Sequence, residues 1–160
     1  GITTCIVFNS KGHLLYTDFG RHSLISFNLE TKTKTPLIKA DVHNLMGDHS
    51  YNDGPLEGAV LTCPHSLLLD DEDNIYCSDS YNHTIRKISA KDNTIETVAG
   101  VPSVIGYKDG KALESLFHYP FGMVFDADGG IIVCDDWNHC LRKLCKDGTV
   151  VTIGNSFLYF

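Results

Sequence analysis

The stretch Asp79-Ser-Tyr-Asn-His-Thr-Ile-Arg-Lys-Ile88 returns 56 positions later as Asp135-Asp-Trp-Asn-His-Cys-Leu-Arg-Lys-Leu144. A looser copy, Asp18-Phe-Gly-Arg-His-Ser-Leu-Ile-Ser-Phe27, stands 61 positions before the first of these. The chain is therefore an internal repeat. Periods of about 40 to 60 residues, with each unit built of short strands and turns, are typical of propellers and related arrays.

The segments around each motif copy repeat as well. Apolar runs alternate with turns that carry Gly, Asn and Asp, the residues that tolerate tight or left-handed backbone conformations. We predict four strands per unit, at 2–8, 14–17, 24–27 and 35–38, at 66–69, 75–78, 85–88 and 94–99, and at 122–125, 131–134, 141–144 and 149–153. Because four short antiparallel strands make one propeller blade, we expect an all-β chain of three blades.

The blades and linkers form one incomplete propeller domain in this interpretation. We place the blades at 1–40, 64–100 and 120–154, the linkers at 41–63 and 101–119, and a tail at 155–160. The linkers repeat too, since Tyr51-Asn-Asp-Gly54 matches Tyr107-Lys-Asp-Gly110 and each leads to a proline. The Asp-Gly pair predicts a turn in both.

The motif resembles the NHL repeat, through Asn82-His83 followed by Ile85 and Asn138-His139 followed by Leu141. The resemblance covers residues 2–154 and weakens in the first unit, where Arg21 replaces the asparagine and Ser26 the lysine. It implies a β-propeller, typically six-bladed, that serves as a binding platform for proteins and, in some members, RNA.

Three blades do not close a ring, because natural propellers have about four to eight. An open arc would leave the apolar faces of its end blades in water. We therefore expect the missing blades to come from the rest of a longer protein or from a second copy related by two-fold symmetry.

The motif carries an acid and a histidine in every blade, which raises the question of a metal or catalytic site. Ligands from several blades would have to converge on one point, whereas one Asp and one His per blade lie radially apart. We interpret these side chains as scaffold that hydrogen-bonds the turn and the neighbouring strand, and we expect no cofactor and no metal. They are Asp18, His22, Asp79, Asn82, His83, Asp135, Asn138 and His139.

The candidate binding residues are those that differ between the repeats. The turn between strands two and three should share a rim with the linker into the next blade, and aromatic side chains gathered there suit a binding surface. They are Phe19, Tyr51, His65, Tyr81, Tyr107, Phe121 and Trp137. The alternative is that Tyr81 and Trp137 simply pack on the adjacent linker.

His65 supports a second hypothesis, since related propeller enzymes place metal ligands near the channel. His43 and His49 in the first linker are possible companions, and a satisfied or solvent-exposed histidine is the simpler alternative. Nucleophile elbows, phosphate-binding glycine loops and metalloprotease motifs do not occur in the sequence.

Charge and cysteine usage indicate which partners and which cellular compartment the protein has. Twenty acids against 13 bases give a net charge of −7, which disfavours RNA and anionic membranes as partners. Apolar runs stay below the roughly 18 residues of a membrane helix, so we expect a soluble protein.

Six cysteines lack a Cys-x-x-Cys pair, and Cys77 and Cys134 lie in apolar strand patterns. We predict buried free thiols, and hence a reducing compartment such as the cytoplasm.

These observations favour a non-catalytic scaffold that binds a protein or peptide, as part of a larger protein. A metal-dependent lyase or lactonase of the propeller type is the alternative, and an RNA-binding propeller is third.

Overall fold

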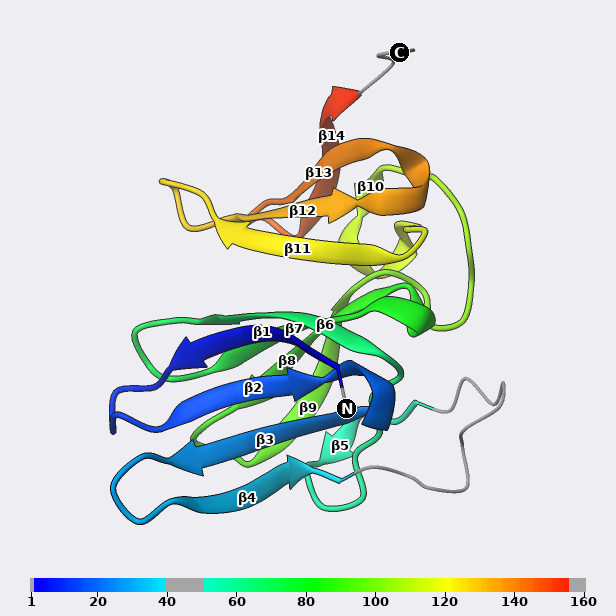
Figure 1. Ribbon diagram of the computed structural model, residues 1–160. Coiled ribbons are helices and arrows are strands. Elements are labelled where there is room, and N and C mark those ends of the chain that lie inside the picture. Colours follow the sequence, from blue (N-terminus) through cyan, green and yellow to red (C-terminus); the bar gives the residue numbers. More distant parts are fainter. Residues whose placement is uncertain (1, 40–50, 156–160) are drawn as a thin grey trace, which may run out of the picture.

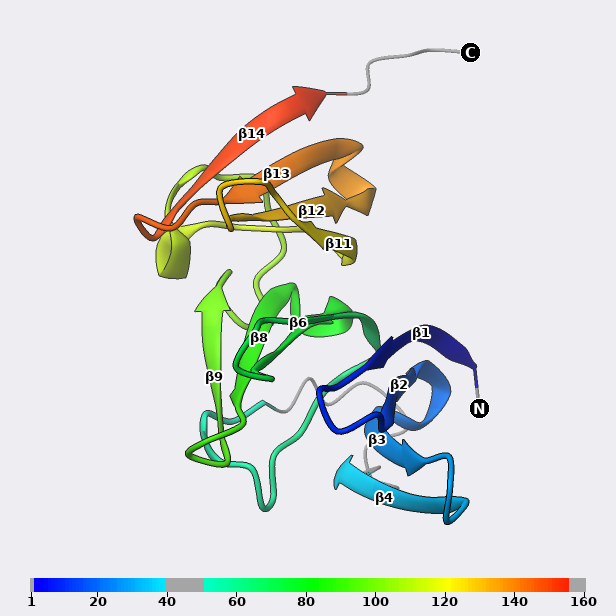
Figure 2. The same cartoon turned by 90° about the vertical axis from the view of Figure 1, so that its left-hand side faces the viewer.

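The computed structural model describes residues 2–39 and 51–155, which form three separate antiparallel sheets (Figures 1 and 2). The first sheet contains, in order, β1 (Thr3–Phe8), β2 (Leu14–Asp18), β3 (Ser23–Asn28) and β4 (Thr33–Ile38). The second contains β5 (Gly54–Pro55), β9 (Thr94–Ala99), β8 (Thr84–Ser89), β7 (Ile75–Asp79) and β6 (Pro64–Leu69). The third contains β10 (Gly110–Lys111), β14 (Thr149–Asn155), β13 (Cys140–Leu144), β12 (Ile131–Asp135) and β11 (Pro120–Phe125).

The structure thus confirms the all-β prediction of three four-stranded blades, and it adds a fifth strand to two of them. In β5, Gly54 pairs with Ile95, and in β10, Gly110 pairs with Val150. These strands have two residues each and contain the glycine of the Asp-Gly pair, so no alternating pattern of apolar residues predicts them. Each fastens a linker to the outer edge of the blade that follows it.

The blades are arranged around their first strands, with β6 in contact with both β1 and β11. Because side chains alternate along a strand, each blade has two apolar faces. In the second blade, Leu67 and Cys77 face a core shared with the first blade, whereas Ile85 and Ala99 face a core shared with the third. The cores between consecutive blades hold the described part of the chain together.

The outer faces of the first and third blades have no such partner among the described residues. Ile6 and Phe8 alternate with core residues of β1 and are 56% and 60% exposed. Val124 is 55% exposed on the opposite side of the arc. Cys134 also lies on that side and is exposed, so the prediction that it is buried was wrong. The counterpart of Cys134 in the second blade, Ser78, is fully buried because the third blade packs on it.

The motif itself forms a short 3-10 turn between the second and third strands of every blade. These turns are η1 (Phe19–Arg21), η2 (Ser80–Asn82) and η4 (Asp136–Asn138), and a fourth 3-10 turn, η3 (Ala112–Glu114), lies in the second linker. The motif histidine follows each turn with φ values of 53°, 58° and 51°. His, Asn and Asp adopt this left-handed conformation more readily than other non-glycine residues.

Candidate functional site

Two kinds of segment meet at one end of the blades: the 3-10 turns, and the linker residues that lead into the innermost strands. The Tyr81 N–H donates to the carbonyl oxygen of Thr62 at 3.1 Å, and the Trp137 N–H donates to that of His118 at 3.2 Å. The side chains of the turns and of the strand starts therefore share one face of the arc.

Aromatic side chains connect the inner part of this face. The rings of His65 and Phe121, from β6 and β11, are stacked with centroids 4.4 Å apart. His65 also meets the edge of Phe19 at 6.3 Å, and Phe19 meets Tyr81 at 6.0 Å. Four of the predicted binding residues, contributed by all three blades, thus lie in one continuous path.

The path continues outward through a residue that the sequence interpretation missed. The Tyr119 ring lies 4.8 Å from that of Tyr81 and 5.2 Å from that of Trp137. His118 flanks both Tyr119 and Trp137. We call six of these side chains the aromatic rim: Phe19, His65, Tyr81, Tyr119, Phe121 and Trp137.

The aromatic rim is partly open to solvent. Trp137 is 59% exposed, and the other five side chains are half-buried. Burial lowers the pKa of His65, against the opposing effect of the Asp136 carboxylate, and burial raises the pKa of the Tyr81 phenol. Burial thus favours the uncharged forms of both rings, and the exposed carboxylate of Asp136 acts electrostatically on His65.

The motif aspartates have a different role, which is to hold the turn and the linker of their own blade. Asp79 is fully buried and accepts hydrogen bonds from the Thr62 N–H, the Asn82 amide and the Arg86 guanidinium. Burial raises the pKa of Asp79, although Arg86 and these donors act to lower it. Asp135 is also fully buried, and its partners are the His118 N–H, Asn138 and Arg142.

The motif histidines connect one blade to the next. The Nδ1 atom of His22 accepts the Cys63 N–H at 2.9 Å, and that of His83 accepts the Tyr119 N–H at 3.2 Å. Cys63 and Tyr119 are equivalent residues, one position before the strand proline. In the third blade, His139 is exposed.

Cys63 also contacts His22 through its side chain, with Sγ 3.5 Å from Nδ1. A Cys–His contact raises the question of a nucleophile, which requires a thiolate. Burial, together with Asp79, raises the pKa of the Cys63 thiol to about 11. The thiol is therefore protonated at neutral pH, and this pair lacks the activation that catalysis needs.

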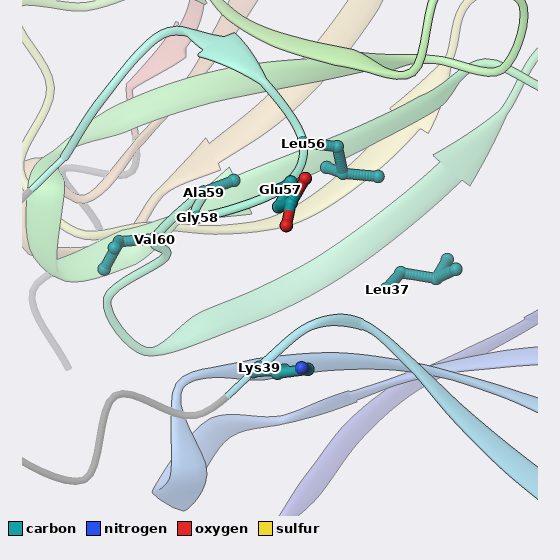
Figure 3. Close-up of a pocket in the computed structure, with 7 residues that line it drawn as sticks. All are labelled: Leu37, Lys39, Leu56, Glu57, Gly58, Ala59 and Val60. Carbon is teal, nitrogen blue, oxygen red and sulfur yellow. The ribbon is translucent and has the colours of Figure 1, made fainter.

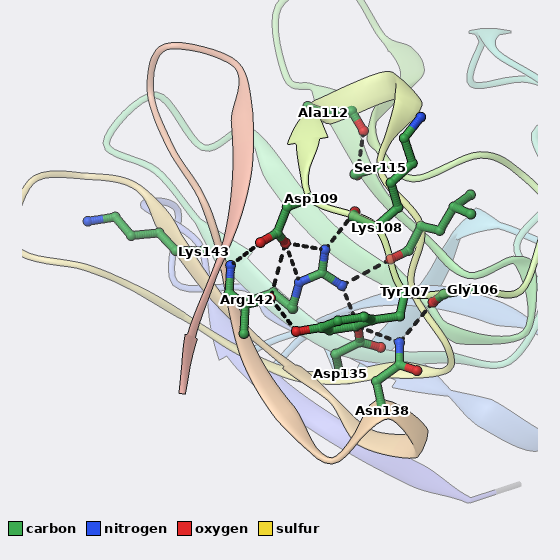
Figure 4. A network of polar contacts seen from close by, with 12 residues as sticks. Gly106, Tyr107, Lys108, Asp109, Ala112, Ser115, Asp135, Asn138, Arg142 and Lys143 are labelled. Atoms are coloured by element: carbon green, nitrogen blue, oxygen red, sulfur yellow. Dashed lines mark hydrogen bonds and ion pairs between the residues drawn. The ribbon is translucent and has the colours of Figure 1, made fainter. Parts of the chain in front are cut away.

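Two arginines in the third strands of the second and third blades, Arg86 and Arg142, are fully buried. Arg142 donates to Asp135 at 2.7 Å, to Asp109 at 2.8 Å and to the Lys108 carbonyl oxygen at 2.7 Å (Figure 4). Arg86 makes the corresponding contacts with Asp79, Asp53 and the Asn52 carbonyl oxygen. Each guanidinium thus holds an Asp-Gly linker on its own blade, and we call each of these two arginines with its partners an arginine clamp.

The same arginines contact Tyr51 and Tyr107, two predicted binding residues that lie outside the aromatic rim. The Arg86 guanidinium lies 5.6 Å from the Tyr51 ring centre, and that of Arg142 lies 5.0 Å from the Tyr107 ring centre. Figure 4 shows the Tyr107 ring lying flat against Arg142. These two tyrosines cover the clamps.

The first blade lacks the clamp, because Ile25 occupies the position of Arg86. Asp18 is buried, and its Oδ2 atom lies 3.9 Å from the exposed Arg21. The divergence of the first repeat therefore has a structural counterpart in the missing arginine.

A half-open groove of about 330 Å³ separates the first blade from the end of the first linker. Figure 3 shows Leu37 and Lys39 on one side of it and residues 56–60 on the other. Lys39 stands where the second blade has Gly100, whose φ is +91° and whose N–H donates to the Ala112 carbonyl oxygen at 2.9 Å. A side chain at Gly100 would meet the His83 carbonyl oxygen at 2.5 Å, so only glycine allows the close approach that shuts the corresponding gap.

The residues that the structure describes contain no group of three His, Cys, Asp or Glu side chains that could hold a metal ion. His43 and His49 lie outside the described residues. All six cysteines are unpaired, three of them buried. Within the described ranges, 2–39 and 51–155, no helix is long and apolar enough to cross a membrane.

Comparisons with known proteins agree with this geometry. The model of the NHL repeat matches residues 117–144. Over 93 residues, 58% of this chain, the sequence is 33% identical to the protein SUPPRESSOR OF QUENCHING 1, chloroplastic, of Arabidopsis thaliana. Over 103 residues, 63% of this chain, it is 28% identical to the human NHL repeat-containing protein 2.

Solved structures give the same result for the whole fold. A structural genomics protein of unknown function from Bacteroides thetaiotaomicron superposes on 95% of this chain with a TM-score of 0.70 and 26% identity. The match spans 35% of that structure, and the matches to the curated relatives span 9% and 14% of theirs. The chain thus corresponds to a minor part of each protein. Residues 117–144 match the NHL repeat, and by its repeats, its blades and these similarities the chain resembles NHL-repeat β-propellers.

Proposed function

We propose that this chain is a non-catalytic propeller scaffold whose aromatic rim binds a protein or peptide partner. The observation that carries the proposal is the continuity of the aromatic rim, which joins side chains of all three blades on one face. Exposed aromatic side chains, Trp and Tyr above all, are enriched among the residues that dominate protein interfaces.

The structural role of the motif acids and histidines also supports the proposal of a non-catalytic scaffold. Asp79 and Asp135 accept backbone and arginine donors, and His22 and His83 accept backbone N–H groups, so these four side chains hold turns and linkers in place. RNA is a weaker candidate partner, since a net charge of −7 opposes a polyanion.

The exposed apolar faces of the end blades support a second part of the proposal. Ile6 and Phe8 on one end, and Val124 and Leu141 on the other, occupy positions that face a neighbouring blade in the middle of the arc. We propose that further blades of a longer protein cover them, with a second copy as the alternative. The mass in solution separates these ideas: a stable single-chain monomer contradicts completion, and a dimer favours the second copy.

Alanine variants test the binding proposal. Tyr81→Ala and Trp137→Ala should reduce capture of the proteins that co-purify with the chain, because both remove rim side chains. Tyr51→Ala is the matched control, since Tyr51 is 45% exposed but covers an arginine clamp away from the aromatic rim. If the two rim variants stay folded and capture every partner as well as the unaltered chain, the proposal is wrong.

The metal-dependent lyase or lactonase is the competing proposal, and His65 is its candidate ligand. The neutral ring favoured by burial suits metal binding, whereas stacking on Phe121 suits the aromatic rim. Metal analysis of the purified protein decides between them. Stoichiometric zinc or calcium that is lost in His65→Gln would overturn the scaffold proposal.

We also propose that the protein works in a reducing compartment, and specifically in the cytoplasm. The support is that all six cysteines are unpaired. Acid quenching of cells followed by alkylation of the unfolded chain tests this, since six modified cysteines are expected and an intermolecular or intramolecular disulfide would refute it.

A further inference from the structure

We infer that the aromatic rim recognises a cationic side chain, that of arginine or lysine, presented by a peptide segment of the partner. This inference rests on the proposed binding function and names the chemistry of its ligand. It follows from the mutual angles of the rings, from their exposure and from the charge beside them.

The rings form walls and not a flat layer. Phe19 and Tyr81 are inclined at 74°, Tyr81 and Tyr119 at 61°, and Tyr119 and Trp137 at 57°. Angles of this size mean that the rings do not lie in one plane, so their π faces point in several directions. A cation within about 6 Å of such faces is attracted by their quadrupoles, and Trp and Tyr attract it most strongly.

Trp137 differs from the two tyrosines of the clamps in what lies against its ring. Tyr51 and Tyr107 already cover guanidinium groups of this chain. Trp137 is 59% exposed and has His118 and Tyr119 as aromatic neighbours, and within the described part of the chain no guanidinium or ammonium group lies over its ring. The same pairing of guanidinium and ring that the chain uses in its clamps is thus available to a partner at Trp137.

Charge favours the same ligand. Asp136 precedes Trp137 in η4, is exposed, and acts electrostatically on His65 of the aromatic rim. Arg21, at the other end, stands next to Asp18. With a net charge of −7, the chain attracts cationic segments over long range and repels the phosphates of nucleic acids.

A pair of labelled peptides tests the inference. One contains arginines spaced by glycine, and the other carries neutral citrulline in place of each arginine, which keeps the shape and removes the charge. Binding is measured by fluorescence anisotropy, and the emission of Trp137, the single tryptophan, reports contact with the site. The arginine peptide should bind at least about fivefold more tightly and should change the Trp137 emission.

Variants locate the binding. Tyr119→Leu and Asp136→Asn should each weaken the arginine peptide about two- to fivefold, whereas Tyr119→Phe should retain binding because it keeps the ring. Asp71→Asn is the matched control, since Asp71 is an exposed acid in the β6–β7 turn at the opposite end of the blade.

Equal binding of the two peptides would overturn the cation inference and leave a partner-binding aromatic rim in place. Equal effects of Asp136→Asn and Asp71→Asn would overturn it in favour of general charge attraction. Tighter binding of single-stranded oligouridine than of the arginine peptide would also overturn it, and would assign the rim to nucleic acid. Failure of the proposed function itself is recognised separately, by unchanged partner capture in Tyr81→Ala and Trp137→Ala.

Discussion

The arginine clamp of the third blade gives the sharpest prediction about stability. We expect Arg142→Met to lower the free energy of unfolding by about 3–5 kcal/mol, the usual cost of removing one partner from a buried ion pair. Methionine keeps an apolar stem between Phe117 and Tyr107, each 5.0 Å from the guanidinium, so the loss reports mainly on charge and hydrogen bonds.

The structure explains why the loss should be so large. Arg142 and Asp135 are both fully buried, and the substitution leaves the Asp135 carboxylate with amide donors but no counter-charge. It also removes the donors to the carbonyl oxygens of Leu116 and Lys108. Unpaired buried groups of this kind retain their full desolvation penalty.

Urea unfolding followed by Trp137 fluorescence measures the effect, because Trp137 lies in η4 of the same blade. Lys111→Met is the matched control: it removes an ion pair of 3.1 Å to Glu114 in which both side chains are mostly exposed, and should cost about 0–1 kcal/mol. A difference of less than about 1 kcal/mol between the two variants would refute the reasoning that burial makes the clamp essential.

Three further predictions concern the backbone, the histidines and the thiols. Gly100→Ala should cost about 1–3 kcal/mol more in urea unfolding than Gly12→Ala, because both glycines have positive φ but only Gly100 is crowded by the His83 carbonyl oxygen; equal losses would contradict this. Burial lowers the pKa values of His22 and His65, so the unfolded chain binds protons first, and stability should fall as the pH drops from about 6.5 through the folded pKa values. A double variant, His22→Gln with His65→Gln, should show a smaller fall, and an unchanged pH profile would argue against it. In the native chain, maleimide should modify the exposed Cys134 well before the fully buried Cys77, and mass spectrometry showing the reverse order would contradict the orientation of the third blade.

The repeat was sufficient to predict the blades, because period and strand alternation are local properties of the sequence. It did not reveal the clamps. Arg86 and Arg142 stand between apolar strand ends in the sequence, and a fully buried arginine is rare unless it is paired. Each arginine pairs with an aspartate 33 residues earlier in the chain and with the motif aspartate of its own blade. No local sequence pattern predicts that pairing.

Residues of the candidate site could be predicted where their position follows from the end of the blades at which turns and linkers meet. Phe19, Tyr81 and Trp137 lie in the turns, and the turns meet the linkers there. Tyr119 was not predicted because its counterpart in the preceding linker is Cys63, although both have a φ of 54°. Tyr51 and Tyr107 were grouped with the aromatic rim because the linkers carry them, but the buried guanidinium groups hold their rings instead.

Site-specific photo-crosslinking tests the central claim, that the aromatic rim is the binding surface, and it captures whichever partner is bound. Benzoylphenylalanine is introduced in place of Trp137 on the rim, Asp71 in the β6–β7 turn, or Glu57 beside the groove of the first two blades. After irradiation in cells, the rim position should yield a discrete adduct, and the other two positions should yield none. Adducts from the Asp71 or Glu57 position without one from the Trp137 position would contradict the account.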